Sequence, residues 1–232
     1  FVDMNTGAGI AYAPDTEVYG ASSFKAPYAL YVCEQLVEKG KASLDDVCTV
    51  GATYGLDEPH DPNEAYVTRD LISNAITVSD NDSFKVLRNA YDAQGYESWA
   101  QSLGVTDALI DPVSYYPTYC ARSSARLWCE MLAYLGTGTK TAQWLEGLLE
   151  QTSASFIRAA LEDEGEDVRV LNKAGWLGGD PAYNSVTDAG IIECDGHTYL
   201  MCLMSSMSDG IETELLLEQL ASALFAARDA LA

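Results

Sequence analysis

The spacing of apolar residues changes along the chain. Through the middle, apolar side chains recur about every three to four positions, which is typical of amphipathic helices. Nearer the C-terminus the period shortens to two over residues 168–175, 185–194 and 198–205, which predicts strands. Asp195-Gly196 separates the last two strands and favours a tight turn, so these strands are expected to form a hairpin.

Helical periodicity dominates between these strands and the N-terminal region. The predicted helices cover residues 22–38, 68–76, 82–93, 95–103, 121–135, much of 140–162, and a final stretch from about Glu212. Two strands are expected within residues 1–21, around the turn Asn5-Thr6-Gly7. Residues 51–67 and 104–119 are expected to be loops, the first because it is rich in Gly, Pro, Asp and Asn.

The order of these elements indicates the architecture. Strands occur at both ends and helices fill the middle, so the economical arrangement is an antiparallel sheet built from both termini with a helical lobe inserted. We expect a single α/β domain over residues 1–232. Its α/β lobe would cover about 1–50 and 163–232, and its all-helical lobe about 51–162.

The charge of the chain limits its partners. The formal net charge is −22, and a surface this acidic repels phosphate backbones and anionic membranes, which argues against nucleic-acid binding. No apolar run approaches the roughly 18 residues that a membrane span needs. Residue 1 falls in a predicted strand, so we expect any targeting or anchoring segment to precede it. We expect an exported monomer at the cell surface, in the periplasm or outside the cell.

Cysteine and histidine suggest no metal or cofactor. The six cysteines form no C-x-x-C pair, which disfavours zinc, and their even number fits disulfides as well as buried thiols. His60 and His197 fall in a predicted loop and a predicted turn, and neither has a nucleophile elbow beside it. A Ser-His-Asp triad is therefore disfavoured.

The first candidate for chemistry is Ser22, with Lys25 three positions later at a predicted helix start. Residues three apart share one face of a helix, so the amine can reach the hydroxyl. A serine hydroxyl needs a neighbouring base to act as a nucleophile, and a lysine with a lowered pKa can serve. Taken alone, such a pair on a helix is usually accidental.

Two further short elements would complete a mechanism. Ser79-Asp80-Asn81 lies between two predicted helices, where Ser79 could pass a proton to a leaving group and Asn81 could hold a substrate amide. The same three residue types also cap helices, which is the simpler explanation of the turn alone. Lys173 lies on a predicted strand two positions before Gly175, which would let a substrate approach the backbone. Alone, Lys173 would read as an exposed strand lysine.

The order of these elements resembles the S-x-x-K, S-D-N and K-T-G set of class A β-lactamases and penicillin-binding proteins. The resemblance extends over nearly the whole chain. It implies a five-stranded antiparallel sheet flanked by helices, an all-helical lobe, and a cleft between them. The helix with which this family usually begins has no counterpart in the sequence.

The resemblance also implies roles for individual residues. Ser22 would be the acylated nucleophile and Lys25 its proton acceptor. Ser79 and Lys173 would protonate the leaving group and bind the substrate carboxylate. The backbone N–H groups of Ser22 and Trp176 would form the oxyanion hole.

The sequence departs from the family at two places. Residues 104–117 contain no glutamate to activate the deacylating water, and Asp111 is the nearest substitute. Its side chain is one methylene shorter, and such a misplacement can cost about 100-fold in rate. Ala174 follows Lys173 where the family usually has a hydroxyl residue, and losing one hydrogen bond to a carboxylate costs roughly 1.5–3 kcal/mol.

Three functions remain open from the sequence. The first is a D,D-peptidase or transpeptidase-like enzyme that forms an acyl-enzyme with peptidoglycan-type peptides and is trapped by β-lactams. The second is a class A-like β-lactamase that hydrolyses the drug with Asp111 or another base. The third is a non-catalytic domain that binds a wall peptide or a β-lactam.

Overall fold

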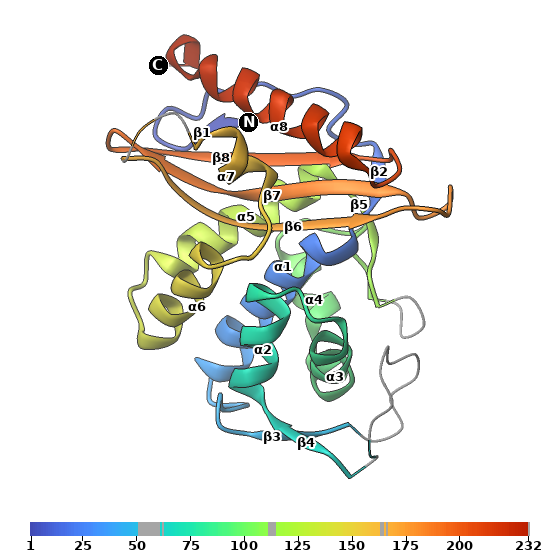
Figure 1. The fold of residues 1–232 in the computed structure, drawn as a ribbon. Coiled ribbons are helices and arrows are strands. Elements are labelled where there is room, and N and C mark those ends of the chain that lie inside the picture. The colour runs from blue at the N-terminus through green and yellow to red at the C-terminus, as the bar shows by residue number, and fades with distance from the viewer. Residues whose placement is uncertain (51–60, 62, 111–114, 163–164, 166, 232) are drawn as a thin grey trace.

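An antiparallel sheet forms one half of the computed structural model, which describes residues 1–50, 61, 63–110, 115–162, 165 and 167–231. The strand order is β1 (Val2–Asp3), β8 (His197–Ser205), β7 (Ser185–Cys194) and β6 (Arg169–Leu177). All neighbouring strands are antiparallel, so the long hairpin pairs with the very beginning of the chain. β6 is the outermost strand on the side that faces the helical lobe (Figure 1).

Helices cover both faces of this sheet. α8 (Ile211–Ala226) and the short α7 (Phe156–Ala160) lie on one face, and α5 (Ala121–Leu135) crosses the other (Figure 1). Successive side chains of β6 point to opposite faces of the sheet, so neighbouring residues join different cores. Val170 packs in the core beneath α8, and Leu171 packs in the core formed with the helices on the other face.

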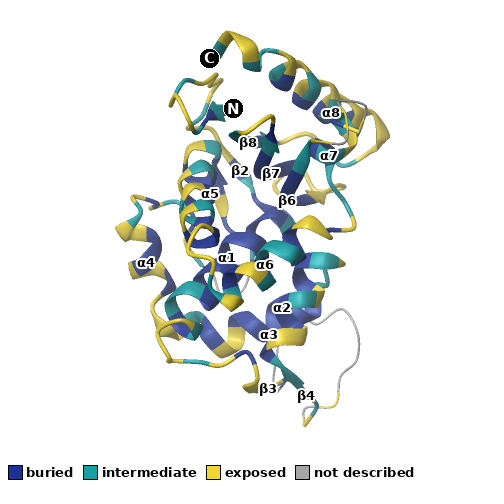
Figure 2. Cartoon of the chain, turned by 90° about the vertical axis from the view of Figure 1, so that its left-hand side faces the viewer, coloured by how far each residue is buried: buried dark blue, intermediate teal, exposed yellow. Residues whose placement is uncertain are grey.

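The helical half of the molecule is arranged around one buried helix. A 3₁₀ turn (Ala21–Phe24) leads into α1 (Lys25–Tyr31), which continues as a π-helical turn (Val32–Val37). Every residue of α1 is buried, as expected for a helix with apolar side chains on all sides (Figure 2). The surrounding helices are α2 (Thr68–Thr77), α3 (Asn81–Tyr91), α4 (Tyr96–Ser102) and α6 (Lys140–Glu150). None of the described helices has the length and apolar character needed to cross a membrane.

The predicted α/β fold with an antiparallel sheet and a helical lobe is confirmed, and two details differ. The fifth position of the expected sheet contains only an isolated bridge between Val2 and Gly9, because the polar segment after β1 has no alternating apolar pattern. The second predicted N-terminal strand, β2 (Glu17–Tyr19), pairs instead with β5 (Thr118–Cys120) in a separate small sheet.

The segment predicted as a loop over 51–67 ends in a strand. β4 (Ala65–Val67) pairs with β3 (Val47–Thr49), and both strands are only three residues long. Such short strands carry too little alternation to be recognised beside many turn-forming residues. Residues 51–60 and 62 lie outside the described part of the chain, and the lobe boundaries near 50 and 163 remain a prediction.

Candidate active site

The turn that carries Ser22 joins β2 to α1 and is held in an unusual backbone conformation. Ala21 has φ +45°, a left-handed value that a non-glycine residue adopts only where its surroundings impose it. The hydroxyl of Ser23 donates to the carbonyl of Gly20 at 2.7 Å, and the hydroxyl of Thr187 on β7 donates to the same carbonyl at 3.3 Å. The position of Ser22 is therefore fixed by its neighbours on both sides.

Gly175 allows β6 to approach this turn closely. A Cβ atom at Gly175 would lie 2.5 Å from the backbone nitrogen of Ser22 and would also collide with the backbone nitrogen of Ser23. No side chain can occupy such a space without moving the backbone. The glycine is thus required by the contact between the outer strand and the turn.

The Ser79-Asp80-Asn81 turn joins α2 to α3. Ser79 has φ +59°, so this turn also contains a non-glycine residue in the left-handed region. The carboxylate of Asp80 accepts a hydrogen bond from the backbone N–H of Ser83 at 2.6 Å and caps α3. The capping explanation of the motif is therefore correct for Asp80, while Ser79 and Asn81 face the lysines.

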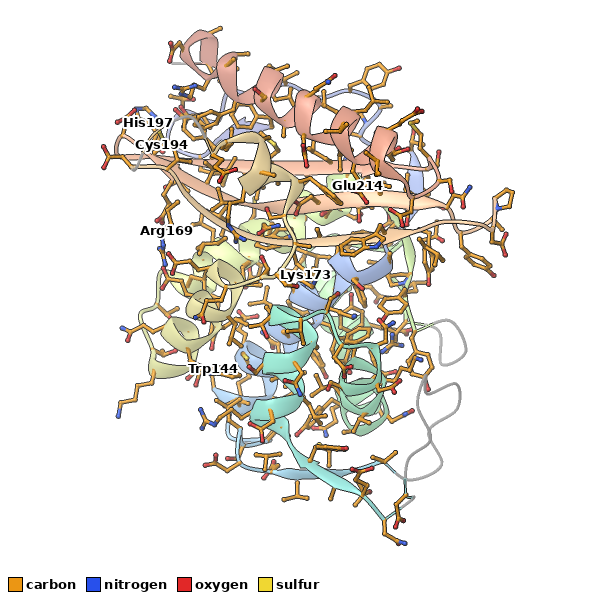
Figure 3. All side chains as sticks on the ribbon, in the orientation of Figure 1. Trp144, Arg169, Lys173, Cys194, His197 and Glu214 are labelled. Atoms are coloured by element: carbon orange, nitrogen blue, oxygen red, sulfur yellow. The ribbon has the colours of Figure 1, made fainter. Side chains whose placement is uncertain are left out.

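The amines of Lys25 and Lys173 converge on Ser79. Lys25 Nζ donates to the carbonyl of Ser79 at 2.5 Å, to its hydroxyl at 3.3 Å, and to Asn81 Oδ1 at 2.8 Å. Lys173 Nζ donates to the Ser79 hydroxyl at 3.0 Å and to the carbonyl of Ala174 at 3.0 Å. Each lysine is only 1 % exposed, and Lys173 lies between the sheet and the helical lobe (Figure 3). One hydroxyl is thus shared by two buried amines, one from α1 and one from β6.

A buried carboxylate supports Lys173 from behind the strand. Asp188 on β7 is paired in register with Ala174 and is fully buried. It accepts hydrogen bonds from Asn172 Nδ2 at 2.7 Å and from the backbone N–H of Ile157 at 3.0 Å. Asp188 was not predicted from the sequence, although an aspartate in the middle of an apolar strand indicates a buried carboxylate.

Burial shifts the pKa values of Lys173 and Asp188 toward each other. Desolvation lowers the pKa of Lys173 to about 8, and the negative charge of Asp188 partly opposes that change. Desolvation raises the pKa of Asp188 to about 6, opposed by its hydrogen bonds and by the charge of Lys173. Lys173 therefore remains mainly cationic at neutral pH and can bind an anion.

Aromatic rings enclose Lys25. Its Nζ lies 5.7 Å from the ring centroid of Tyr116 and 5.9 Å from that of Phe84, and these two rings stack at 5.2 Å. The hydroxyl of Tyr116 donates to Asn81 Oδ1 at 2.8 Å. The sequence was searched over residues 104–117 only for a base, so Tyr116 was missed. No local sequence signal predicts that an aromatic ring will lie beside a buried lysine.

Two further predicted site residues, Trp176 and Asp111, and the two histidines that the sequence disfavoured remain to be placed. Trp176 follows Gly175 on β6, is 38 % exposed, and packs its ring edge-on against Phe156. Asp111 and His60 lie outside the described residues. His197 lies 3.3 Å from the carboxylate of Asp3, far along the chain from every motif.

Nothing in the described part of the chain offers a metal site. No group of three or more His, Cys, Asp or Glu side chains among those residues is arranged to hold an ion. All six cysteines are free thiols. Burial raises the pKa of the Cys202 thiol to about 12, so it is protonated at neutral pH and inert as a ligand.

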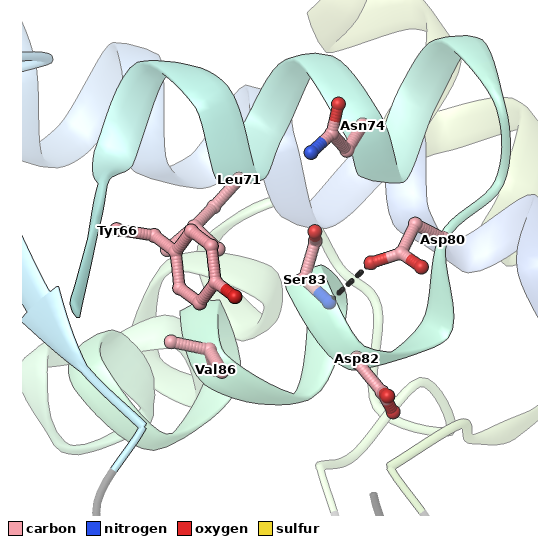
Figure 4. A pocket seen from close by; sticks show the side chains of 7 residues that line it. All are labelled: Tyr66, Leu71, Asn74, Asp80, Asp82, Ser83 and Val86. Atoms are coloured by element: carbon pink, nitrogen blue, oxygen red, sulfur yellow. Dashed lines mark hydrogen bonds between the residues drawn. The ribbon is translucent and has the colours of Figure 1, made fainter. Parts of the chain in front are cut away.

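A pocket of about 240 Å³ borders the Ser79 turn (Figure 4). Its lining residues are Tyr66, Leu71, Asn74, Asp80, Asp82, Ser83 and Val86. Neither lysine lines this pocket, nor does Ser22 or Ser79. The pocket therefore lies next to the Ser79 turn but is not lined by the two lysines or the two serines of the candidate site.

The site elements and the fold agree with one class of protein. A serine three positions before a lysine at the start of a buried helix, and a second serine that accepts hydrogen bonds from two lysines, match the motifs of serine β-lactamases and penicillin-binding proteins. The chain belongs to the Beta-lactamase enzyme family, whose family model, Beta-lactamase2, matches residues 1–227. No curated protein sequence matches it.

Solved structures with the same fold have low sequence identity to this chain. PBP-A superposes with a TM-score of 0.82 at 20 % identity, over 99 % of this chain and 88 % of that chain. A β-lactamase from Sphaerobacter thermophilus gives 0.79 at 20 % identity, over 100 % and 89 %. A β-lactamase from Chitinophaga pinensis gives 0.77 at 20 % identity, over 97 % and 90 %.

Proposed function

We propose that this protein forms an acyl-enzyme at Ser22 with a peptidoglycan-type peptide or a β-lactam. The observation that carries the proposal is the position of the Ser79 hydroxyl, 3.3 Å from Lys25 Nζ and 3.0 Å from Lys173 Nζ. A protein that only binds its ligand has no need for two buried amines on one hydroxyl. Burying an amine in this way is unfavourable unless hydrogen bonds compensate.

These positions support the following course of acylation. The Ser22 oxygen attacks the carbonyl carbon and gives its proton to Lys25, which acts as the general base. The carbon–nitrogen bond then breaks, and the leaving nitrogen takes a proton from Ser79, which is replenished from the neighbouring amines. Lys173 binds the substrate carboxylate without the help of a hydroxyl at Ala174.

The oxyanion would be stabilised by the backbone N–H groups of Ser22 and Trp176. The close approach of Gly175 to the nitrogen of Ser22 supports this assignment, because it brings the outer strand against the nucleophile turn. Alternate N–H groups of an outer strand are not used in pairing with its neighbour and can serve a ligand.

Deacylation is the step that decides between a peptidase and a β-lactamase. Residues 104–117 lack a glutamate, and a general base typically contributes about 10²–10⁴-fold. We therefore favour a D,D-peptidase or transpeptidase-like enzyme whose ester with a β-lactam persists. The fold-related PBP-A, one mutant of which was solved as an acyl-enzyme with penicillin G, supports this choice. Peptidoglycan lies outside the cytoplasm, so we propose that the protein acts there. We also propose that it is a monomer.

The alternative is a β-lactamase, favoured by the fold-related enzymes of that name. A steady-state assay with a chromogenic cephalosporin separates the two. Turnover of many molecules per second that is lost in Asp111→Asn but kept in Asp195→Asn would establish a β-lactamase with an aspartate base. Slow turnover in all three proteins supports the peptidase-like function.

The mass of the intact protein after mixing with penicillin G tests the proposal itself. We expect a lasting adduct in the wild type and none in Ser22→Ala, with the same circular dichroism spectrum. Ser153→Ala removes an exposed serine and should be labelled like the wild type. Labelling of Ser22→Ala at the wild-type rate would contradict the assignment of the nucleophile, and absence of any adduct would favour a non-catalytic binder.

A further inference from the structure

The small sheet of β2 and β5 places a buried tyrosine against the turn that carries Ser22. Tyr119 is the middle residue of β5, where it pairs in register with Val18 of β2, and its side chain is fully buried. Its ring lies against Gly20, because a Cβ atom at Gly20 would lie 2.3 Å from Tyr119 Cε1. Gly20 has an ordinary helical φ of −73°, so this close contact, and not the backbone conformation, requires a glycine there.

The hydroxyl of Tyr119 begins a short chain of hydrogen bonds. Ser23 uses its single hydroxyl proton in the 2.7 Å bond to the carbonyl of Gly20, so it accepts a hydrogen bond from Tyr119 across the 3.2 Å between their oxygens. Burial raises the pKa of Tyr119 to about 12, so its hydroxyl is protonated and able to donate. The chain therefore runs from Tyr119 through Ser23 to the carbonyl of Gly20, and hydrogen bonds in series strengthen one another.

The carbonyl of Gly20 is the point at which the turn is held. It accepts hydrogen bonds from the Ser23 hydroxyl, from the backbone N–H of Ser23 at 3.2 Å, and from the hydroxyl of Thr187 at 3.3 Å. The same peptide group leads into Ala21, whose φ of +45° is strained for a residue with a side chain. Holding the carbonyl keeps Ala21 in this conformation and so sets the direction in which the next residue, Ser22, is presented.

Packing alone does not explain why this residue is a tyrosine. The ring of Tyr119 meets Phe24 edge-on at 6.0 Å, and a phenylalanine would make the same contact and fit equally well against Gly20. A buried hydroxyl is unfavourable unless it is hydrogen-bonded. The bond to Ser23 is therefore the reason for a hydroxyl at this position.

We propose that Tyr119 is a positioning residue, which through Ser23 fixes the orientation of Ser22 for acylation. The proposal rests on acylation of Ser22 as described above. The hydrogen-bond chain sets both the direction of the Ser22 hydroxyl and the place of its N–H, which the proposed oxyanion hole uses. Tyr119 acts through Ser23 and the strained Ala21, not on the substrate itself.

Tyr119→Phe tests the hydroxyl without removing the ring. We expect the first-order rate constant of acylation at saturating penicillin G to fall by about ten- to 100-fold, because a small displacement of the nucleophile slows its attack. The dissociation constant of the complex that precedes acylation should stay near the wild-type value, because no group that binds the drug is removed. Ser23→Ala should show the same split. The double variant should be no slower than Ser23→Ala, because both substitutions break one chain.

Tyr96→Phe is the matched control. Tyr96 is also fully buried, its ring meets Phe24 edge-on at 5.7 Å, and its hydroxyl donates to the carbonyl of Ala108 at 3.1 Å. This variant loses one buried hydrogen bond, as Tyr119→Phe does, so it should lower the melting temperature yet leave the rate constant of acylation unchanged. A wild-type rate constant in Tyr119→Phe, or equal losses in the two variants, would overturn the positioning role while leaving acylation at Ser22 intact.

Failure of the proposed function would give a different result. If penicillin G leaves no adduct on the wild type, that function fails, and the effect of Tyr119 on the turn is tested by nuclear magnetic resonance. The amide signals of Ala21 and Ser22 must shift in Tyr119→Phe and stay in place in Tyr96→Phe, because only the first variant loosens the Gly20 carbonyl. Signals that respond equally to both variants, or to neither, would overturn the role of Tyr119.

Discussion

The two turns that face each other across the site are built alike but held differently. Each leads into a helix and contains a non-glycine residue with positive φ, Ala21 at +45° and Ser79 at +59°. The first turn is held by backbone packing against Gly175 and by the hydroxyl of Thr187. The second is held by hydrogen bonds from the amines of Lys25 and Lys173.

The difference means that packing sets the geometry of the first turn, whereas the charge of neighbouring groups affects the second. A left-handed non-glycine residue costs roughly 1–3 kcal/mol and persists only where its surroundings determine it. Around Ser22 the determining contacts are packing and neutral hydrogen bonds, so its position does not depend on pH. Around Ser79 they are amines, so its position and its proton depend on the charge of the lysines.

The largest expected effect comes from removing an amine from the second turn. Lys25→Ala takes away the proposed base and the amine that donates to the carbonyl of Ser79 and to Asn81 Oδ1. We expect acylation by penicillin G to fall by about 10²–10⁴-fold, measured by the time course of adduct mass. Lys41→Ala, at an exposed lysine, is the control. A loss smaller than tenfold would require a different base.

The first turn is tested through packing alone. Gly175→Ala places a Cβ against the nitrogens of Ser22 and Ser23, and the resulting displacement should reduce acylation by about 100-fold. Gly190→Ala creates a similar clash, with the carbonyl of Leu171. It should lower the melting temperature yet leave acylation per folded molecule unchanged. Equal losses of acylation in the two variants would show that the effect of Gly175 is general strain.

The pH dependence should come from the second turn. Burial lowers the pKa of Lys173 from 10.5 to about 8, so its amine is cationic below pH 8 and becomes neutral above it. The rate of acylation by a substrate with a carboxylate should therefore fall about tenfold per pH unit above that value. Lys173→Arg keeps its charge and should remove this decline. A wild-type rate that stays level up to about pH 10 would contradict the role of Lys173.

The smallest effect concerns a helix cap. Asp80→Ala removes the cap of α3 and should lower the free energy of unfolding by about 0.5–2 kcal/mol. Thr139→Ala removes the corresponding cap of α6, which accepts from the N–H of Ala142 at 3.2 Å, and should cost a similar amount. Only Asp80→Ala should also slow acylation, because its cap borders Ser79. If denaturant unfolding and acylation change alike in the two variants, the Asp80 cap is purely structural.

Local signals predicted much of the fold. The apolar period fixed α5 at residues 121–135, and the Asp195-Gly196 turn identified the long hairpin. The pairing of β2 with β5 could not be predicted, because each is three residues long and their partners lie far apart in the chain. Pairing of this kind is determined by tertiary packing, which short sequence windows do not contain.

The site residues also divide into those that local sequence signals predicted and those that they did not. Ser22, Lys25, Ser79 and Lys173 were found because their types and order form a motif, although their roles remain predictions. Asp188 and Tyr116 reach the site only through strand register and loop packing. Their positions follow from the folded chain and not from spacing in the sequence.

The close contact at Gly175 has a consequence for solubility. An outer strand such as β6 presents unpaired N–H and C=O groups that can recruit a strand from another molecule and start aggregation. The turn from Ala21 to Phe24 lies against that strand and leaves less of it open to a second chain. The segment that carries Ser22 therefore also limits how much of β6 a strand from a second molecule could pair with, and loosening it would expose more of that strand.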